Sequence, residues 1–600
     1  MDWDLSSFFP VFDGPEYQRF QEDLKTELAA LVQPLPDAGD DDVDQTADRW
    51  IDWLMRYEKV LTRLSHIASY LSCLTAADSA SEVYAAQKGA LSLDWASLEK
   101  ARNVILETLG RASDDLVARL KGDPRLDDAT YALDRLHQKS RHRMSPAEEA
   151  LAADLGVDGF DAWGRLYDTL SGNLEFDMVS PDGSTRTLSM SQRRSLLGHP
   201  DREIRKAAFD GGNRTWESAA RVTAAALNSL AGTRNTLLRK RGQKHFLEPV
   251  LFDARIGRPC LDALFDALGQ SQEVGREVLR YKAAQMGRSR VAWFDLEAPT
   301  QTGADGETPI EWSEACQWVQ EAFDRSFPEL GLFFRNAVAK RWIDWSPRRG
   351  KQQGGFCTTS SLTGESRIFM TYNGTVNDVM TLAHEAGHAY HGHLLGDRRG
   401  LARSYPMTLA ETASTFAEQL LTEGIVGDPD RPSVHKKRLL DSQVRHAVIF
   451  LLDIPIRYHF ERRFNDERQD GEVSVSRLKA MMSEIQREWL GDTLEPGGED
   501  PFFWASKLHF YITERSFYNF PYTFGFLLSR KLFARYQAEG SSFLQHYKAF
   551  LRGTSTRDAD SLILDVLHED PGDPAFWMSA IDSLREPFEA YRKLIADSTT

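Results

Sequence analysis

The sequence of 600 residues has few cysteines, no long apolar run and no excess of positive charge. Its four cysteines lie far apart without a C-x-x-C pair, which argues against a disulfide framework and favours a reducing compartment. No apolar stretch approaches the roughly 18 residues of a membrane-spanning helix. The acidic N-terminus has no basic segment followed by an apolar core, so we expect no signal peptide. The formal net charge of −17 argues against a nucleic-acid partner, because phosphate binding needs clustered Lys and Arg. We therefore expect a cytoplasmic protein that binds neither membrane nor nucleic acid.

Strand signals are also few, and helical periodicity dominates. Apolar residues recur at intervals of three and four through residues 48–74, as in an amphipathic helix. A hairpin is predicted over residues 175–189, where Pro181-Asp182-Gly183 supplies the turn, and a short strand over residues 366–372. The predicted fold is mostly α, with a small sheet directly before a histidine-rich segment.

That segment, TLAHEAGHAYHGH, crowds four histidines and one glutamate into residues 381–393. Thr375 is the expected N-cap, with Asp378 three positions later to complement the helix start. Gly396 fits the C-terminal stop. The spacing therefore predicts one helix of about five turns that carries the whole segment.

The pattern inside this helix is H-E-x-x-H. His384 and His388 lie one turn apart on one face, so both imidazoles can reach the same ion. Glu385 is rotated by about 100° from His384 and would lie beside the open position of the metal, which suits a base that activates zinc-bound water. His391 lies roughly 10 Å from His384, too far to share the ion, and is expected to line a cavity or form a hydrogen bond. His393 points elsewhere and is expected at the surface.

Two histidines do not complete a zinc site, so a third ligand is needed. The following segment, residues 408–424, offers Glu411, Glu418 and Glu423. Glu411 could instead form a capping box with Thr408, a purely local device. Spacing alone leaves Glu411 and Glu418 as close competitors.

TLAHEAGHAYH followed by AETASTFAEQLL resembles the thimet oligopeptidase and neurolysin family of zinc peptidases, in particular its bacterial oligoendopeptidase F branch. The resemblance continues in DREIRKAAFDGGNRTW, AWFDLEAP and KLHFYITERSFYNFPYTFG, and covers roughly residues 175–590. It implies Glu411, which opens the E-x-x-S motif, as the third ligand of one Zn²⁺ per chain. It further implies a helical two-lobed body that encloses a deep channel, with a thermolysin-like catalytic core. The expected domains are an N-terminal helical region, residues 1–174, and a catalytic zinc metallopeptidase domain, residues 175–600.

The resemblance also implies that a histidine and tyrosines hold the scissile carbonyl. The family motif, similar to FYVYKYATG, aligns with residues 517–525, so these roles fall to His509, Tyr518 and Tyr522. Positions 520 and 521 depart from the motif as Phe and Pro. By itself, an aromatic stripe at helical spacing is typical of a core.

GGFCTTSS, residues 354–361, precedes the histidine helix. In zinc peptidases of this architecture, a sheet edge at that position pairs with the substrate backbone. Gly354, Gly355 and Phe356 are therefore candidate substrate-binding residues, since glycine allows close backbone approach. An ordinary turn is the alternative.

The predicted function is a zinc-dependent endopeptidase that cleaves short oligopeptides. A zinc carboxypeptidase or dipeptidyl carboxypeptidase would use the same site and would add an Arg or Lys that clamps the substrate carboxylate. A non-catalytic peptide-binding zinc protein is disfavoured, because a structural site needs a fourth ligand and no adjacent base such as Glu385.

Overall fold

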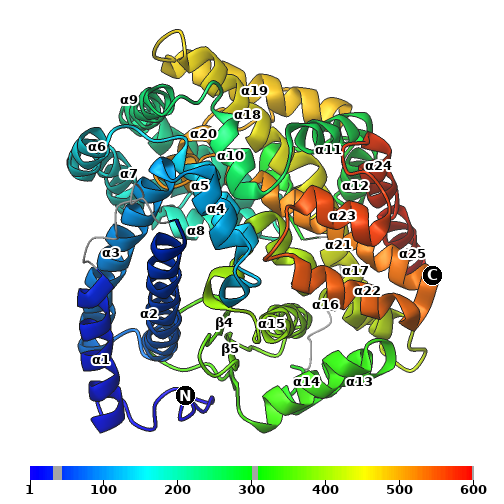
Figure 1. The fold of residues 1–600 in the computed structure, drawn as a ribbon. Helices are drawn as coiled ribbons and strands as arrows, with labels where there is room; N and C mark the ends of the chain where they lie inside the picture. Colours follow the sequence, from blue (N-terminus) through cyan, green and yellow to red (C-terminus); the bar gives the residue numbers. More distant parts are fainter. Residues whose placement is uncertain (32–42, 300–308, 598–600) are drawn as a thin grey trace. The chain divides into compact units, whose positions relative to one another are not determined.

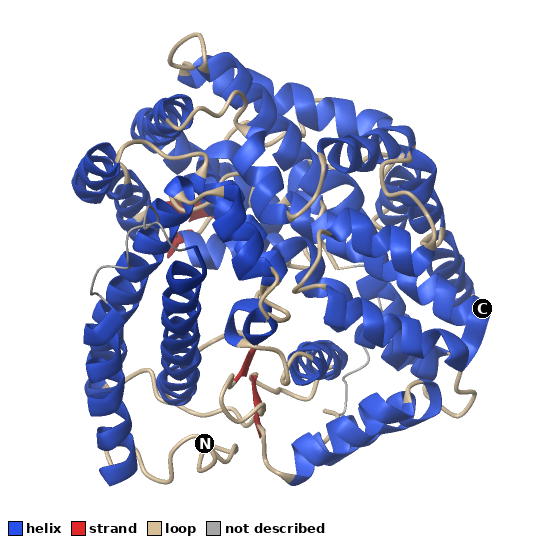
Figure 2. Ribbon diagram, viewed as in Figure 1, coloured by secondary structure: helices blue, strands red, loops and turns tan. Residues whose placement is uncertain are grey.

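The computed structural model describes residues 1–31, 43–299 and 309–597. Helices dominate, and the strands of the described residues form two small sheets (Figures 1 and 2). The predicted mostly α fold is therefore confirmed. Within the described residues, no helix is long and apolar enough to cross a membrane.

The chain divides into two compact units that interleave along the sequence. Unit 1 comprises the described parts of residues 1–143, 307–431 and 532–568, and unit 2 those of residues 144–306, 432–531 and 569–600. Helix α21, Phe520–Glu539, runs across the boundary between residues 531 and 532. The domain boundary after residue 174 stays a prediction.

Unit 1 contains the N-terminal helices, the three-stranded sheet and the histidine helix. Its elements are α1 Pro15–Leu31, α2 Val43–Ala77, α3 Glu82–Arg111, α4 Asp114–Lys121, η1 Pro124–Leu126, α5 Thr130–Ser140, α13 Trp312–Ser326, α14 Pro328–Ala339, β3 Ile343–Asp344, β4 Phe356–Thr359, β5 Ser366–Phe369, α15 Val376–Leu394, η3 Gly400–Ala402, α16 Met407–Val426, η7 Gly540–Ser542, α22 Phe543–Gly553 and α23 Ala559–Leu567.

The sheet of unit 1 has the order β3-β5-β4, with β3 parallel and β4 antiparallel to β5. Strand β4 is thus an edge strand. Its residues alternate between two faces, and the hydroxyl of Thr358 donates a hydrogen bond to that of Ser69 in α2 at 2.8 Å. Phe369 of β5 belongs to the same buried apolar cluster as Leu64 and Leu71 of α2. The N-terminal helices therefore support the strand that precedes the histidine helix.

Unit 2 is built from long helices and one hairpin. Its elements are α6 Pro146–Gly159, α7 Asp161–Asn173, β1 Glu175–Val179, β2 Thr185–Ser189, α8 Met190–Leu197, α9 Arg202–Lys240, α10 Leu247–Ala254, α11 Arg258–Gln270, α12 Gln272–Gln285, η2 Trp293–Asp295, α17 Ser433–Val448, η4 Ile449–Asp453, α18 Ile454–Arg468, α19 Val475–Leu490, η5 Gly491–Thr493, α20 Phe503–Ser506, η6 Leu508–Tyr511, α24 Pro574–Asp582 and α25 Arg585–Ala596.

These elements confirm the predicted hairpin and include a local helix irregularity. Strands β1 and β2 pair antiparallel from Glu175↔Ser189 to Val179↔Thr185, as the hairpin pattern predicts. The segment η4 is a turn of π-helix between α17 and α18. Thr523 of α21 donates a hydrogen bond to the carbonyl of Phe450 in this π turn at 2.8 Å.

Candidate active site

The histidine segment forms α15, and its ends follow the local sequence code. The hydroxyl of Thr375 accepts from the backbone N–H of Asp378 at 3.1 Å, and the Asp378 carboxylate accepts from the N–H of Thr375 at 3.0 Å. This reciprocal capping box satisfies two N–H groups that the first helical turn leaves unpaired. The helix ends at Leu394, two residues before Gly396. The predicted helix and its N-cap are confirmed.

Helix α16 lies unusually close to α15 because of Gly387 in the H-E-x-x-H motif. A Cβ at this position would stand 2.5 Å from the Ala413 carbonyl oxygen and 2.7 Å from the Ser414 Cα. Only glycine permits this approach. The N-cap of α16 is Pro406, without a side-chain cap hydrogen bond, so the alternative that Glu411 serves a capping box with Thr408 is wrong.

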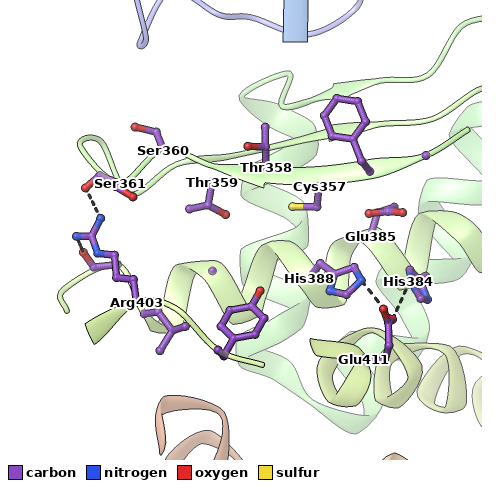
Figure 3. Close-up of a pocket in the computed structure, with 16 residues that line it drawn as sticks. Cys357, Thr358, Thr359, Ser360, Ser361, His384, Glu385, His388, Arg403 and Glu411 are labelled. Atoms are coloured by element: carbon purple, nitrogen blue, oxygen red, sulfur yellow. Dashed lines mark hydrogen bonds and ion pairs between the residues drawn. The ribbon is translucent and has the colours of Figure 1, made fainter. Parts of the chain in front are cut away.

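Three donor atoms from these two helices converge on one point. His384 Nε2 and His388 Nε2 lie 3.4 Å and 3.5 Å from Glu411 Oε2, and all three atoms lie within 4.8 Å of one another (Figure 3). Zinc–ligand bonds of about 2.1 Å in a tetrahedral site place neighbouring ligand atoms about 3.4 Å apart. The donor set therefore fits a divalent metal ion such as zinc in its chemistry, and both carboxylate–imidazole distances match this spacing.

Glu418 holds the first histidine in the orientation that a ligand needs. Its Oε1 lies 2.6 Å from His384 Nδ1, so the ring donates its Nδ1–H to the carboxylate and leaves Nε2 free for a metal. Ser414 similarly donates to Glu411 Oε2 at 2.8 Å. The two glutamates that the sequence leaves as alternative third ligands thus make different contacts. Glu411 lies where the donor atoms converge, and Glu418 contacts the opposite ring nitrogen of His384.

The charges of the site favour a bound cation. Burial disfavours the imidazolium of His384, but the hydrogen bond to Glu418 and the charges of Glu418 and Glu411 outweigh it and raise its pKa to about 9. Burial also opposes ionisation of Glu411, yet the hydrogen bond and charge of His388 lower its pKa to about 2. The carboxylate of Glu411 is thereby kept ionised next to two imidazoles.

Glu385 lies beside the ligands with one oxygen unused. It is 6% exposed, and its Oε2 has no hydrogen-bond partner within the described residues. Burial raises the pKa of this carboxyl above its usual value. A Cβ on Gly355 would stand 3.3 Å from Glu385 Oε1, so glycine keeps the space beside this carboxylate open. A buried, unpaired acceptor next to a metal donor set is suited to bind and deprotonate a water molecule.

A cavity of about 590 Å³ extends from these residues along β4 (Figure 3). Cys357 and Thr359 point toward α15, and Thr358 points away (Figure 3). The lining residues are Gly355, Phe356, Cys357, Thr358, Thr359, Ser360, Ser361, His384, Glu385, His388, Gly392, Leu395, Gly396, Arg403, Tyr405 and Glu411. Gly355 and Phe356 thus line the same cavity as the three donor residues, and their role in substrate binding stays a prediction. Gly354 does not line it, although its φ of +100° suits glycine.

The other two histidines of α15 lie where the sequence predicts. His391 is fully buried, and its Nε2 lies 2.9 Å from Thr554 Oγ1 and 3.1 Å from the Leu551 carbonyl oxygen. Burial lowers its pKa to about 3, which keeps this ring neutral. His393 is exposed. Neither histidine belongs to the metal donor set.

Two cavity residues escape the sequence analysis. Tyr405 stacks on His391 with ring centroids 4.4 Å apart, and Arg403 reaches the far end of the cavity, where it donates to the Ser361 carbonyl (Figure 3). Both come from the irregular segment between α15 and α16, which carries no motif. Only the position of Tyr405 shortly before Glu411 could have drawn attention to it.

In unit 2, the structure brings His509, Tyr518 and Tyr522 together. The rings of His509 and Tyr518 lie 4.8 Å apart, and the Tyr522 hydroxyl donates to that of Tyr518 at 3.1 Å. All three side chains are partly exposed, whereas Tyr511 in the same stretch is buried. Pro521 lies in the first turn of α21, where a missing N–H breaks no helical hydrogen bond. The aromatic stripe therefore divides into a buried part and an accessible cluster.

Side chains of other helices hold the loop that leads to this cluster through hydrogen bonds to its backbone. Phe517 has a left-handed backbone with φ of 54°, and its N–H donates to Glu461 Oε1 at 2.6 Å. Arg234 donates to the carbonyls of Thr513 at 3.3 Å and Arg515 at 3.4 Å. Burial raises the pKa of Glu461 to about 7, while the Phe517 N–H and the charge of Arg234 oppose this shift.

A helix-borne pair of imidazoles, a carboxylate from the next helix and an unpaired carboxylate beside them define the donor set of a metal-dependent hydrolase. Comparison with known proteins agrees with this class. Residues 195–580 match Peptidase family M3, and residues 109–176 match the family described as Oligopeptidase F. The chain therefore belongs to peptidase family M3, a family of metallopeptidases, which confirms the resemblance found in the sequence.

The individual relatives and similar structures are described as peptidases or oligopeptidases. The chain is 22% identical over 567 residues to the oligopeptidase PepF of Bacillus subtilis, which covers 92% of this chain and 81% of that protein. It is 23% identical over 427 residues to the chromosomal oligoendopeptidase F of Lactococcus lactis subsp. cremoris, covering 70% and 68%. Its fold is similar to the crystal structure of oligoendopeptidase F from Enterococcus faecium, with a TM-score of 0.70, 20% identity and coverage of 97% and 99%. A protein from Chlamydophila abortus described as a peptidase gives a TM-score of 0.82 at 18% identity, with 98% of both chains covered.

Proposed function

We propose that this chain is a zinc-dependent endopeptidase that hydrolyses internal bonds of short oligopeptides. The observation that carries the proposal is the convergence of His384, His388 and Glu411 with the unpaired carboxylate of Glu385 beside them. Membership of peptidase family M3 supports the reaction class.

One zinc ion per chain would be held by His384 Nε2, His388 Nε2 and Glu411 Oε2. Bound there, zinc supplies Lewis acidity, which polarises a carbonyl and makes a water molecule more acidic. Glu418 keeps His384 in the tautomer whose Nε2 can bind the metal. Two imidazoles and one carboxylate leave a coordination position open for substrate or water, as in catalytic zinc sites.

Glu385 acts as the general base and then as the acid. It takes a proton from the attacking water as the oxygen–carbon bond forms, and gives it to the nitrogen of the leaving amine as the peptide bond breaks. The raised pKa of its carboxyl brings the group closer to the pH at which both transfers are efficient.

The substrate backbone pairs with β4. This strand is at the sheet edge and borders the cavity that contains the donor atoms. An extended peptide laid along it would form main-chain hydrogen bonds without requiring one particular side chain. Gly355 and Phe356 lie at the end of β4 nearest Glu385, and Gly354 provides the left-handed turn before it.

His509, Tyr518 and Tyr522 contribute polar groups that hold the substrate around its scissile peptide bond. The family resemblance and the clustering of their side chains in unit 2 support this assignment. Removing a single hydroxyl, in Tyr518→Phe or Tyr522→Phe, should lower kcat by ~10²-fold with little change in KM for at least one variant. Steady-state kinetics would measure this, and two variants with wild-type rates would return both tyrosines to a packing role.

A carboxypeptidase or dipeptidyl carboxypeptidase is the second candidate, because Arg403 lines the cavity. Its guanidinium donates to the carbonyls of Arg398 at 2.7 Å, Gly396 at 2.8 Å and Ser361. These bonds hold the charge in the loop, where it could still attract a substrate carboxylate. Blocking the C-terminus of a test peptide as an amide separates the two functions: an endopeptidase continues to cleave, whereas a carboxypeptidase stops.

We further propose that the enzyme acts on short, flexible peptides in a reducing compartment such as the cytoplasm. The four cysteines are all free, which is consistent with that location. Mass spectrometry should detect internal cleavage of short peptides by the zinc-loaded protein, and activity should fall as peptides lengthen. A native folded protein should remain intact. Rapid digestion of unfolded casein would contradict the closed channel that the resemblance implies, and inactivity on every peptide would contradict the proposed function.

A further inference from the structure

Asn519 is the immediate polar partner of His509, and this contact decides which ring nitrogen carries the proton. His509 Nδ1 lies 2.5 Å from Asn519 Oδ1. Asn519 is 2% exposed and directly precedes α21. It stands where the family motif FYVYKYATG carries valine, which could not form this bond.

The orientation of the Asn519 amide is fixed by a third residue. Arg457 Nη1 donates to Asn519 Oδ1 at 3.1 Å. An arginine can only donate, so the atom that faces both Arg457 and His509 must be the amide oxygen. Since that oxygen can only accept, the Nδ1 atom of a neutral His509 must carry the proton. Its Nε2 is then unprotonated and can only accept a hydrogen bond.

Arg457 is itself held in place by a carboxylate at a distorted point of the helix. It pairs with both oxygens of Asp453, with Nε donating to Oδ1 at 3.0 Å and Nη2 to Oδ2. Asp453 is the last residue of the π turn η4. Such π turns change the direction of the side chains that follow and are frequent at functional sites. The relay Asp453–Arg457–Asn519–His509 therefore links a helix irregularity to the protonation of one imidazole.

The charges around His509 keep the ring neutral. Burial lowers its pKa to about 4, and the positive charges of Lys507, Arg457 and Arg194 add to this effect, while the hydrogen bond with Asn519 opposes it. Lys507 also has a lowered pKa, of about 8, because it is buried near Arg457. A neutral ring at physiological pH has one N–H only, and Asn519 already receives it.

The hydroxyl of Tyr518, next to His509, can donate a hydrogen bond, whereas Nε2 of His509 can only accept one. Tyr522 donates its hydroxyl hydrogen to the oxygen of Tyr518 at 3.1 Å. The hydrogen of the Tyr518 hydroxyl remains available for another acceptor. The accessible cluster thus presents a bare imidazole nitrogen and a phenolic O–H side by side.

We propose that Asn519 is a positioning residue that fixes His509 as the Nδ1–H tautomer, so that Nε2 accepts a hydrogen bond from a backbone N–H of the bound peptide. Tyr518, and not His509, is then the group of this cluster that donates to the developing oxyanion. This division of roles rests on the proposed peptidase function. The tautomer itself depends only on contacts within unit 2.

The first test is nuclear magnetic resonance of the zinc-loaded protein with ¹⁵N-labelled histidine, using His509→Gln to identify the signals. Between pH 6 and pH 8, we expect a protonated Nδ1 and an unprotonated Nε2 for His509, on a ring that stays neutral. Asn519→Asp retains an acceptor for Nδ1–H and should keep the tautomer. Asn519→Val removes the acceptor and should shift the population toward the Nε2–H form. A wild-type His509 with protonated Nε2 would overturn the proposal, whether or not the protein cleaves peptides.

The second test compares the kinetics of the same variants on one peptide. Asn519→Val should lower kcat by about 10–100-fold, the range typical when a partner that orients a histidine in a metal site is lost. Asn519→Asp should recover most of that loss, which a merely structural role of the amide would not explain. Val and Asp variants with equal kcat would contradict the assignment. If wild-type protein shows the expected tautomer but cleaves no peptide, the proposed function fails and the positioning role of Asn519 stands.

Discussion

Gly387→Ala should weaken zinc binding although Gly387 is not a ligand. The added Cβ would stand 2.5 Å from the Ala413 carbonyl oxygen and 2.7 Å from the Ser414 Cα. Ordinary contact begins at 3.4 Å, so the helices would have to separate locally by about 0.9 Å. Because both obstacles are backbone atoms of α16, no side-chain rotation can relieve the contact. Glu411, two residues before Ala413, would move with them.

The magnitude follows from the packing of the two helices. Overpacking of this kind costs about 1–3 kcal/mol. If most of this falls on the contact between Glu411 and the two histidines, zinc affinity should drop by about 10–100-fold, since each 1.4 kcal/mol is tenfold. Competition with a chromogenic chelator would measure the zinc affinity. Thermal unfolding of the apo protein would measure the share of the overpacking cost that lowers the stability of the fold.

Gly89→Ala is the matched control. Gly89 lies on the exposed face of α3, and a Cβ there would meet nothing within 4 Å. This variant should leave zinc affinity unchanged and could raise the free energy of unfolding by up to about 1 kcal/mol through better helix propensity. A Gly387→Ala protein that binds zinc like wild type and unfolds at the wild-type temperature would refute the reasoning.

Two further predictions concern Glu418 and Glu461. Glu418→Gln should retain the fold and reduce zinc affinity by about 10-fold, because the neutral amide orients His384 less strongly; an empty site in this variant and a filled one in Glu411→Ala would reverse the ligand assignment. Glu461 has a folded-state pKa of about 7 against 4.5 for an ordinary glutamate carboxyl, so between these values the folded chain holds a proton that the unfolded chain releases. The contribution of this group to the free energy of unfolding is fully present below pH 4.5. It falls by about 3 kcal/mol as the pH rises to 7. Glu461→Gln, which mimics the protonated form, should therefore unfold at a higher temperature than wild type at pH 8 and at a similar temperature at pH 4.5, and identical melting curves at both pH values would contradict the shift.

Much of the metal centre could be predicted from the sequence because its information is local. The N-cap, the helix and the one-turn spacing of His384 and His388 all lie within about twenty residues. Glu411 and Glu418 could not be separated by spacing, because residues seven apart lie two turns apart on the same helix face. Only the close packing of α15 and α16 at Gly387 decides which carboxylate meets the ligand atoms.

The remaining features depend on contacts between distant parts of the chain. Arg403 and Tyr405 belong to a segment without periodicity or motif, and the only signal for either is the position of Tyr405 shortly before Glu411. Asn519 is visible as a departure from the family motif, but its meaning comes from Arg457, which lies 62 residues earlier in the chain. Patterns within one helix are predictable from the sequence, whereas the orientation of a side chain by a remote partner is not.

The general-base role of Glu385 is the central claim, and Glu385→Gln tests it most directly. The substitution keeps the size of the side chain and removes the charge that accepts a proton. Zinc content and kcat for one peptide should be measured on the same purified sample. We expect one zinc ion per chain, as in wild type, with kcat lowered by about 10²–10⁴-fold. A zinc-loaded Glu385→Gln protein that cleaves the peptide at the wild-type rate would contradict the proposed mechanism.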